Sequence, residues 1–306
     1  MNRLTPLFLV FLALSGCGKK VNQREADEAY LVADSAVSSL NGALNDSEQS
    51  ASYARNRPAF ELIPSAYAAS CGLSRFSPIV GSSCSGTVAN KTVTSDFSGC
   101  TAGRSDEFSL RGQVSLSFDS ASTCDTWLAG SGLPTSGFVT RTTSNFQRTN
   151  PNGSVVTVTS ASHTNYAGTT LGGGVTTTFG VGSRTVTIAG LRRVRTSADG
   201  ASVFDHSVTT TTPIVITGTR SSGNRTVQSG AIRVDHNLAR FSSATSISGL
   251  SWNTSCCHPI AGTLSFSLLG SSSGSITVDY ATGSCGEANI SRNGTFLARV
   301  DLPSCE

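Results

Sequence analysis

Lysine is almost absent from this chain, in which Lys19, Lys20 and Lys91 are the only examples. Charged residues of all kinds make up 13% of the 306 residues, and the formal net charge is +3. The few charges are dispersed, so no basic stretch forms the electrostatic footprint that nucleic-acid binding requires. We therefore expect no nucleic-acid partner.

Large aromatic residues and long apolar runs are also scarce. Phe, Trp and Tyr together make up 7% of the chain, and the tryptophans are Trp127 and Trp252. Either one could stack on a sugar ring, although isolated aromatic residues in a β protein usually fill the core or cover a hairpin. The apolar run from Leu7 to Leu14 is far too short for a helix that crosses a bilayer, which needs ~20 residues.

Motifs of the common catalytic and cofactor sites are missing as well. No Gly-x-Ser-x-Gly elbow stands between an expected strand and an expected helix. The glycine-rich stretches Gly172–Gly174 and Gly180–Gly182 do not open a helix, so they are not expected to bind phosphate. The cysteines lack the paired Cys-x-x-Cys spacing of a zinc site. The sequence therefore predicts no cofactor and no metal.

What is present begins with an export signal. Arg3 precedes the short apolar run, and Leu14-Ser15-Gly16-Cys17 ends it. A basic residue followed by a short apolar run and small residues is typical of a signal peptide, here residues 1–16. The four residues that end the run resemble the lipobox of bacterial lipoproteins.

The resemblance to bacterial lipoproteins covers residues 1–17 and implies a location. It implies that Cys17 receives the lipid, palmitate included, and becomes the first residue of the mature protein, with 17–21 as a lipidated tether. In lipoproteins of enteric-type bacteria, an Asp directly after that Cys retains the protein in the inner membrane. This chain has Gly18 there, so the resemblance favours a lipid-anchored protein of the cell envelope at the outer membrane.

Cysteine usage supports the same location. The chain has nine cysteines, and setting Cys17 aside leaves an even number, which predicts disulfides in an oxidising compartment. We expect pairing within each of two groups, with the neighbours Cys256 and Cys257 bonded to different partners. The two groups stand on either side of a long cysteine-free stretch and consist of Cys71, Cys84, Cys100 and Cys124, then Cys256, Cys257, Cys285 and Cys305.

Domain organisation follows from a change of periodicity. Residues 22–46 predict a helix, because apolar residues recur there at steps of four and three. This thin apolar stripe could pack on the following domain or on another copy. Residues 47–70 have the composition of a linker. From residue 71 to 306 the period changes to two, which predicts a disulfide-stabilised all-β domain.

The β pattern is clearest where Leu264, Phe266 and Leu268 alternate with hydroxyl residues, as in an antiparallel sheet with one polar face. Val203–Thr211 and Ile214–Thr219 are predicted as separate strands. Turns rich in glycine and asparagine separate the runs at Asn150–Gly153, Ala198–Gly200, Ser221–Asn224, Gly270–Gly274 and Asn293–Gly294. The predicted fold is all-β, a large antiparallel meander in the form of a curved sheet, a sandwich or a barrel-like closure, preceded by the short N-terminal helix.

Two acid–imidazole pairs recur, Asp205-His206 and Asp235-His236. Adjacent residues of a strand point to opposite faces, so each Asp is badly placed to orient its own His. If the two strands pair, His206 and His236 could share a face and form a weak metal or acid–base site. The alternative that the usual exposure of such residues favours is a set of exposed polar positions on a sheet.

Two hypotheses about function follow. The β domain is similar to uncharacterised exported Ser/Thr-rich lipoprotein domains through Cys256-Cys257-His258-Pro259 and Gly283-Ser284-Cys285-Gly286, a resemblance that implies no activity. We expect a cell-envelope lipoprotein without catalysis, whose β domain is structural or binds an envelope or surface protein or a glycan. The alternative is a lipid-tethered secreted hydrolase that uses the region of Asp205, His206, Asp235 and His236.

Overall fold

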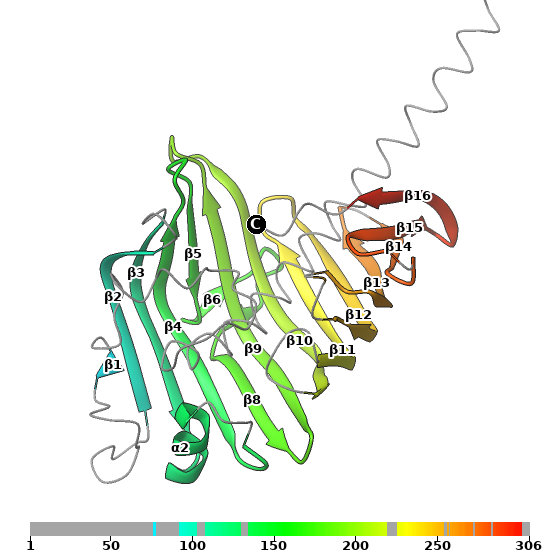
Figure 1. The fold of residues 1–306 in the computed structure, drawn as a ribbon. Helices are drawn as coiled ribbons and strands as arrows, with labels where there is room; N and C mark the ends of the chain where they lie inside the picture. Colours follow the sequence, from blue (N-terminus) through cyan, green and yellow to red (C-terminus); the bar gives the residue numbers. More distant parts are fainter. Residues whose placement is uncertain are drawn as a thin grey trace, which may run out of the picture.

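The computed structural model contains one very large β sheet (Figure 1). It describes residues 76–77, 92–102, 108–129, 134–218, 225–253, 256, 258–271, 273–282 and 284–301. The predicted signal peptide, Cys17, the helix at 22–46 and the linker at 47–70 lie outside these residues. Among the helices of the described ranges, none is long and apolar enough to cross a membrane.

The described elements, in chain order, are β1 (Phe76–Ser77), β2 (Thr92–Ala102), β3 (Phe108–Phe118), α2 (Ala121–Ala129), β4 (Phe138–Thr149), β5 (Val155–Thr159), β6 (His163–Thr164), β7 (Thr170–Leu171), β8 (Gly174–Gly180), β9 (Ser183–Thr196), β10 (Ser202–Gly218), β11 (Arg225–His236), β12 (Phe241–Ser251), β13 (Ala261–Gly270), β14 (Gly274–Asp279), β15 (Glu287–Arg292) and β16 (Thr295–Asp301).

The main sheet is an antiparallel meander of fourteen strands. Consecutive strands are neighbours from β1 to β5 and from β9 to β16, and β5 pairs with β9. β8 pairs with both β4 and β9, and β6 pairs with β7 in a separate hairpin. Strand direction turns steadily across the sheet in Figure 1. The prediction of an all-β antiparallel meander is confirmed, and its form is one continuous sheet with β1 and β16 at the ends of the strand order.

Turns join the strands at the predicted positions that the structure describes, whereas the turn predicted at Ser221–Asn224 lies outside the described residues. Asn150–Gly153 links β4 to β5, and the N–H of Gly153 donates to the carbonyl of Asn150 at 2.9 Å. Asn152 stabilises the same turn because its Oδ1 accepts the backbone N–H of Ser154 at 3.0 Å. The φ of Gly153 is 77°, a left-handed conformation that glycine adopts without strain.

The core lies on one face of the sheet. Leu264, Phe266 and Leu268 of β13 are buried, whereas Ser265 and Ser267 between them are exposed. The register carries the same face to neighbouring strands, since Leu264 lies opposite both Ile247 of β12 and Val278 of β14. The alternation predicted from the sequence is therefore confirmed, and the hydroxyl residues form the other face.

Two local predictions were wrong. Val203–Thr211 and Ile214–Thr219 were expected as separate strands, but β10 runs through both. The strand continues because the register shifts between Thr210 and Val215 leave Pro213, which has no N–H to donate, outside the hydrogen-bonded ladder.

The helix α2 was not expected either. It begins after Ser120, whose Oγ accepts the N–H of Thr123 at 3.0 Å as an N-cap does.

One disulfide joins two connections at the same end of the strands. Cys256, between β12 and β13, bonds to Cys285, between β14 and β15, with an S–S distance of 1.95 Å and a sequence separation of 29. The expected pairing within the C-terminal group is confirmed for these two residues, and Cys256 and Cys257 do not bond to each other. Cys124 is fully buried and also disulfide-bonded. The remaining pairings stay predictions.

Candidate functional site

Strand pairing brings the two sequence-predicted histidines together. His206 of β10 lies directly opposite His236 of β11 in the antiparallel register. The Nδ1 of His236 is 3.0 Å from the Nε2 of His206, which is a hydrogen bond between the two rings. Since both rings lie on the face that carries Val208 and Val234, the prediction of a shared face is confirmed.

Aromatic rings flank this histidine pair on both sides. Phe204 stacks on His206 with 4.6 Å between ring centroids, and Phe241 stacks on His236 with 4.1 Å. The two imidazoles meet edge to face at 4.4 Å. The four rings thus form one row across β10, β11 and β12 at the edge of the apolar core.

Burial keeps both imidazoles neutral at ordinary pH. Desolvation lowers the pKa of His206 to about 3, and the neighbouring His236 and Arg193 add to this effect, whereas Asp205 opposes it. Desolvation likewise lowers the pKa of His236 to about 4 against the attraction of Asp235. A neutral imidazole offers one donor and one acceptor, so one ring donates to the other.

Asp205 bonds to groups other than the histidines. Its carboxylate accepts two hydrogen bonds from Arg192, at 3.0 and 2.6 Å, and one from Asn237 at 2.9 Å. Burial raises the pKa of Asp205, but the hydrogen bonds from Arg192 and Asn237 outweigh it and hold the net value below the ordinary one. The carboxylate therefore orients a guanidinium, not an imidazole.

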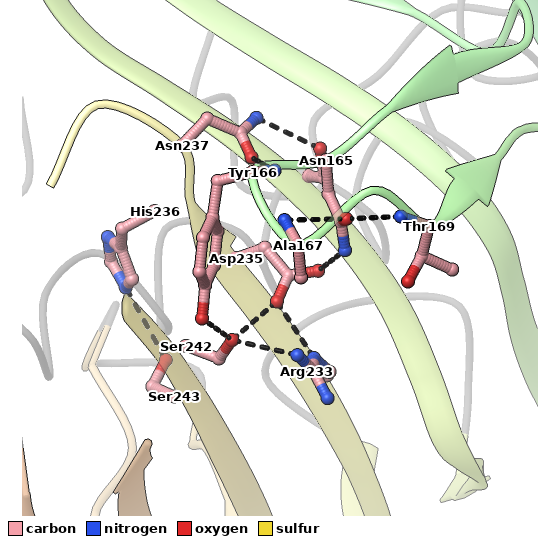
Figure 2. A network of polar contacts seen from close by, with 11 residues as sticks. Asn165, Tyr166, Ala167, Thr169, Arg233, Asp235, His236, Asn237, Ser242 and Ser243 are labelled. Atoms are coloured by element: carbon pink, nitrogen blue, oxygen red, sulfur yellow. Dashed lines mark hydrogen bonds and ion pairs between the residues drawn. The ribbon is translucent and has the colours of Figure 1, made fainter. Parts of the chain in front are cut away.

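Asp235 is the centre of a larger polar network (Figure 2). Its Oδ1 accepts from Arg233 Nε at 2.8 Å and from Ser242 Oγ at 2.6 Å, and its Oδ2 accepts from Asn165 Nδ2 at 2.7 Å. Arg233 stands two residues before Asp235 on β11, so both point to the same face. The network lies on the polar face, behind the strand that carries His236.

A segment far away in sequence closes this network, and we call residues 160–173, which include the β6–β7 hairpin, the strap. At its tip, the hydroxyl of Tyr166 lies 2.8 Å from Ser242 Oγ, and the N–H of Tyr166 donates to Asn237 Oδ1 at 2.9 Å. Asn165 Oδ1 accepts the backbone N–H groups of Ala167 and Thr169, which shapes the tip (Figure 2).

The base of the strap is fixed to the sheet by different contacts. Ser160 Oγ accepts the N–H of Thr143 at 2.8 Å, and the N–H of Gly173 donates to the carbonyl of Ser160 at 2.9 Å. Gly190 of β9 allows the strap to cross closely, because a Cβ there would stand 2.2 Å from the backbone nitrogen of Gly172.

The expectation that the four acid and imidazole residues are exposed is wrong. Asp205, His206, Asp235 and His236 expose 9%, 8%, 1% and 7% of their surface. They can be buried because arginine, amide, hydroxyl or imidazole partners satisfy each side chain. Trp252, considered for sugar stacking, is also buried, under the guanidinium of Arg225 at 4.9 Å from its ring.

The sequence did not indicate the arginines or the strap as part of this site. Arg233-Val234-Asp235 has the spacing of two that places an ion pair on one face of a strand, and that spacing could have suggested the pair. The contacts of Asn165 and Tyr166 span 70 to 76 residues, and no local pattern predicts them.

The geometry limits the chemistry of this region. The described residues contain no group of three or more His, Cys, Asp and Glu side chains placed to hold a metal ion. The imidazoles bond to each other, and the carboxylates bond to arginines on the opposite face. Comparison with models of known families, with curated proteins and with solved structures finds no match. The function is therefore inferred from the residues themselves.

Proposed function

We propose that this chain is a cell-envelope lipoprotein, anchored through Cys17 at the outer membrane, whose β sheet is structural or binds a partner and does not catalyse a reaction. The observation that carries the proposal is the partnering of the two carboxylates. An Asp–His catalytic pair requires the carboxylate to accept from the imidazole, whereas Asp205 and Asp235 accept from Arg192 and Arg233. These residues stabilise the sheet and its strap.

The large area of the sheet supports a role as a scaffold or binding surface. The sheet has fourteen strands, and on β13 and its neighbours one face carries mostly short hydroxyl side chains, with the strap crossing only part of the sheet. Such a face suits an envelope or surface protein, or a glycan, as partner. The lipid anchor is supported by the resemblance of Leu14–Cys17 to the lipobox.

Metabolic labelling tests the anchor. Cells that express the full chain are supplied with labelled palmitate, beside cells that express Cys17→Ser. We expect label in the original chain, together with recovery in the outer-membrane fraction, and loss of both in the variant. Label that persists in the variant would contradict acylation at Cys17.

Hydrolysis of chromogenic esters, glycosides and peptides tests the alternative function. The full chain is compared with the His206→Gln, His236→Gln double variant, and circular dichroism verifies that both are folded. We expect no turnover by either protein. Turnover by the original chain that the folded double variant loses would establish the hydrolase instead.

A further inference from the structure

Exposed apolar side chains gather at one end of the strands. Leu238 lies in the β11–β12 turn, Leu269 is the next-to-last residue of β13, and Phe296 is the second residue of β16. They expose 54%, 50% and 60% of their surface. Since neighbouring strands are antiparallel, the end of β11, the end of β13 and the start of β16 share one rim of the sheet.

Hydrogen bonds join the turns of this rim into one surface. Ser271 Oγ, in the β13–β14 turn, donates to the carbonyl of Ala239 in the β11–β12 turn at 2.9 Å. Asn293 Oδ1, in the β15–β16 turn, accepts the N–H of Ser275 at 2.9 Å. We call Leu238, Leu269 and Phe296 the apolar rim. These residues lie in or beside three turns that the hydrogen bonds link.

Positive charge accompanies the apolar rim. Arg240 lies in the β11–β12 turn and Arg292 ends β15, and in the described part of the chain neither belongs to an ion pair. Of the carboxylates towards this end of the strands, Asp205 and Asp235 are neutralised by arginines, whereas Asp199 in the β9–β10 turn is exposed and bonds to Ser197. At the opposite ends of β14 to β16 lie Asp279, Glu287 and Asp301, of which Glu287 pairs with Arg299.

The combination of apolar side chains and unpaired arginines fits a lipid surface, which has anionic headgroups above an apolar acyl layer. Exposed apolar groups that cluster on a soluble domain mark contact sites. Arginines at such a site are attracted by anionic headgroups, and leucine and phenylalanine insert at the acyl boundary. The opposite rim carries Asp279 and Asp301 without an arginine partner among the described residues, so the same membrane would attract it less, which favours one orientation of the sheet.

We propose that the apolar rim, with Arg240 and Arg292, rests on an anionic lipid surface and sets the domain on the membrane with the β11–β12, β13–β14 and β15–β16 turns facing the lipid. The proposal rests on the lipid anchor of the proposed function, which brings the domain to a membrane without setting its orientation. Each arginine is expected to strengthen contact with anionic lipid about fivefold.

Hydrogen exchange of the full chain tests this contact. The protein is reconstituted in vesicles of phosphatidylglycerol and phosphatidylethanolamine, and separately in phosphatidylcholine vesicles. We expect amides of the β11–β12 turn (237–240) and of the β15–β16 turn (293–296) to exchange at least about tenfold more slowly on the anionic vesicles. The β8–β9 turn at the opposite rim is expected to exchange equally on both. Equal exchange of the rim turns would overturn the proposal, as would protection of both rims alike.

Matched variants separate the rim from general effects of the surface. Leu238→Ser, Leu269→Ser and Phe296→Ser together, or Arg240→Gln with Arg292→Gln, should abolish the protection. The control carries Phe138→Ser and Val181→Ser, which remove exposed apolar side chains from the opposite rim, and should keep it. Protection that survives both rim variants would also overturn the proposal.

Palmitate labelling keeps the two proposals apart. A chain that is labelled at Cys17 but gains no protection on anionic vesicles retains its anchor and loses the rim contact. A chain that takes no label but gains protection loses the anchor and retains the contact with lipid. A protein partner at the rim would give no vesicle-dependent protection and so counts against the proposal.

Discussion

At the residue scale, the histidine pair makes stability depend on pH. The folded-state pKa values of about 3 for His206 and about 4 for His236 lie below the ordinary value of 6.5, so the unfolded chain binds more protons at mildly acidic pH. The contribution of the two histidines to the free energy of unfolding is therefore fully present above about pH 6.5 and is lost as the pH falls towards 3. We expect a loss of about 1 kcal/mol for each histidine between pH 6 and pH 5, measured by urea unfolding.

The double variant His206→Gln, His236→Gln is the control for this pH dependence. It is expected to be less stable at pH 7, because the ring stack with Phe204 and Phe241 is lost. Its unfolding free energy should nevertheless change much less between pH 7 and pH 5. An equal slope in the two proteins would show that other groups cause the acid sensitivity.

Asp235 gives a second prediction at this scale. Asp235→Asn removes the charge from a side chain that is 1% exposed and leaves Arg233, Asn165 and Ser242 with a weaker acceptor. We expect a loss of about 2–3 kcal/mol in unfolding free energy, below the full cost of a broken buried pair because Arg233 is partly solvated. Asp279→Asn, on the same polar face and without an arginine partner among the described residues, should cost under about 0.5 kcal/mol.

At the scale of elements, the strap is predicted to open independently of the sheet. Tyr166→Phe removes one hydrogen bond and should cost about 1 kcal/mol, whereas Asn165→Ala removes a charge-assisted bond to Asp235 and two turn-shaping bonds and should cost more. Hydrogen exchange at 163–171 should accelerate in that order, while β13 amides stay protected. Ser162→Ala, at an exposed strap position, serves as the control, and uniform acceleration across the sheet would contradict local opening.

What the sequence could predict was decided by the range of the interactions. Alternation such as Leu264-Ser265-Phe266 and turns such as Asn150–Gly153 depend on neighbours, so the strands and hairpins were predicted. The meeting of His206 with His236 could be stated conditionally, because one hairpin joins their strands. The strap and its contacts with Asp235 and Ser242 could not be predicted, because strands of two residues show no periodicity and the residues they contact lie some 70 positions away in the sequence.

At the scale of the whole molecule, no layer of helices covers the sheet among the described residues. We therefore expect its stability to depend on the cross-links and turns at its two rims. The apolar rim is joined by hydrogen bonds between turns, and the opposite rim is joined by Cys256–Cys285. The disulfide connects the β12–β13 connection to the β14–β15 connection, so it ties four strands together across a separation of 29 residues. Cys256 is 3% exposed and follows the buried Trp252, whereas Cys285 is exposed, so this cross-link joins the core to the surface of the opposite rim.

We therefore expect Cys256→Ser with Cys285→Ser to lower the unfolding free energy by about 3 kcal/mol, since a loop of this length gains roughly that much conformational entropy when it is released. The loss should appear without reductant as a lower melting temperature. Hydrogen exchange should also become faster in β13 to β15. It should change less in β9 and β10, because these strands are further from the disulfide in the strand order. Ser284→Ala, beside Cys285, is the matched control. If the double variant melts as the original chain does, hydrophobic packing of β12 to β15 is sufficient and the disulfide is not required for stability.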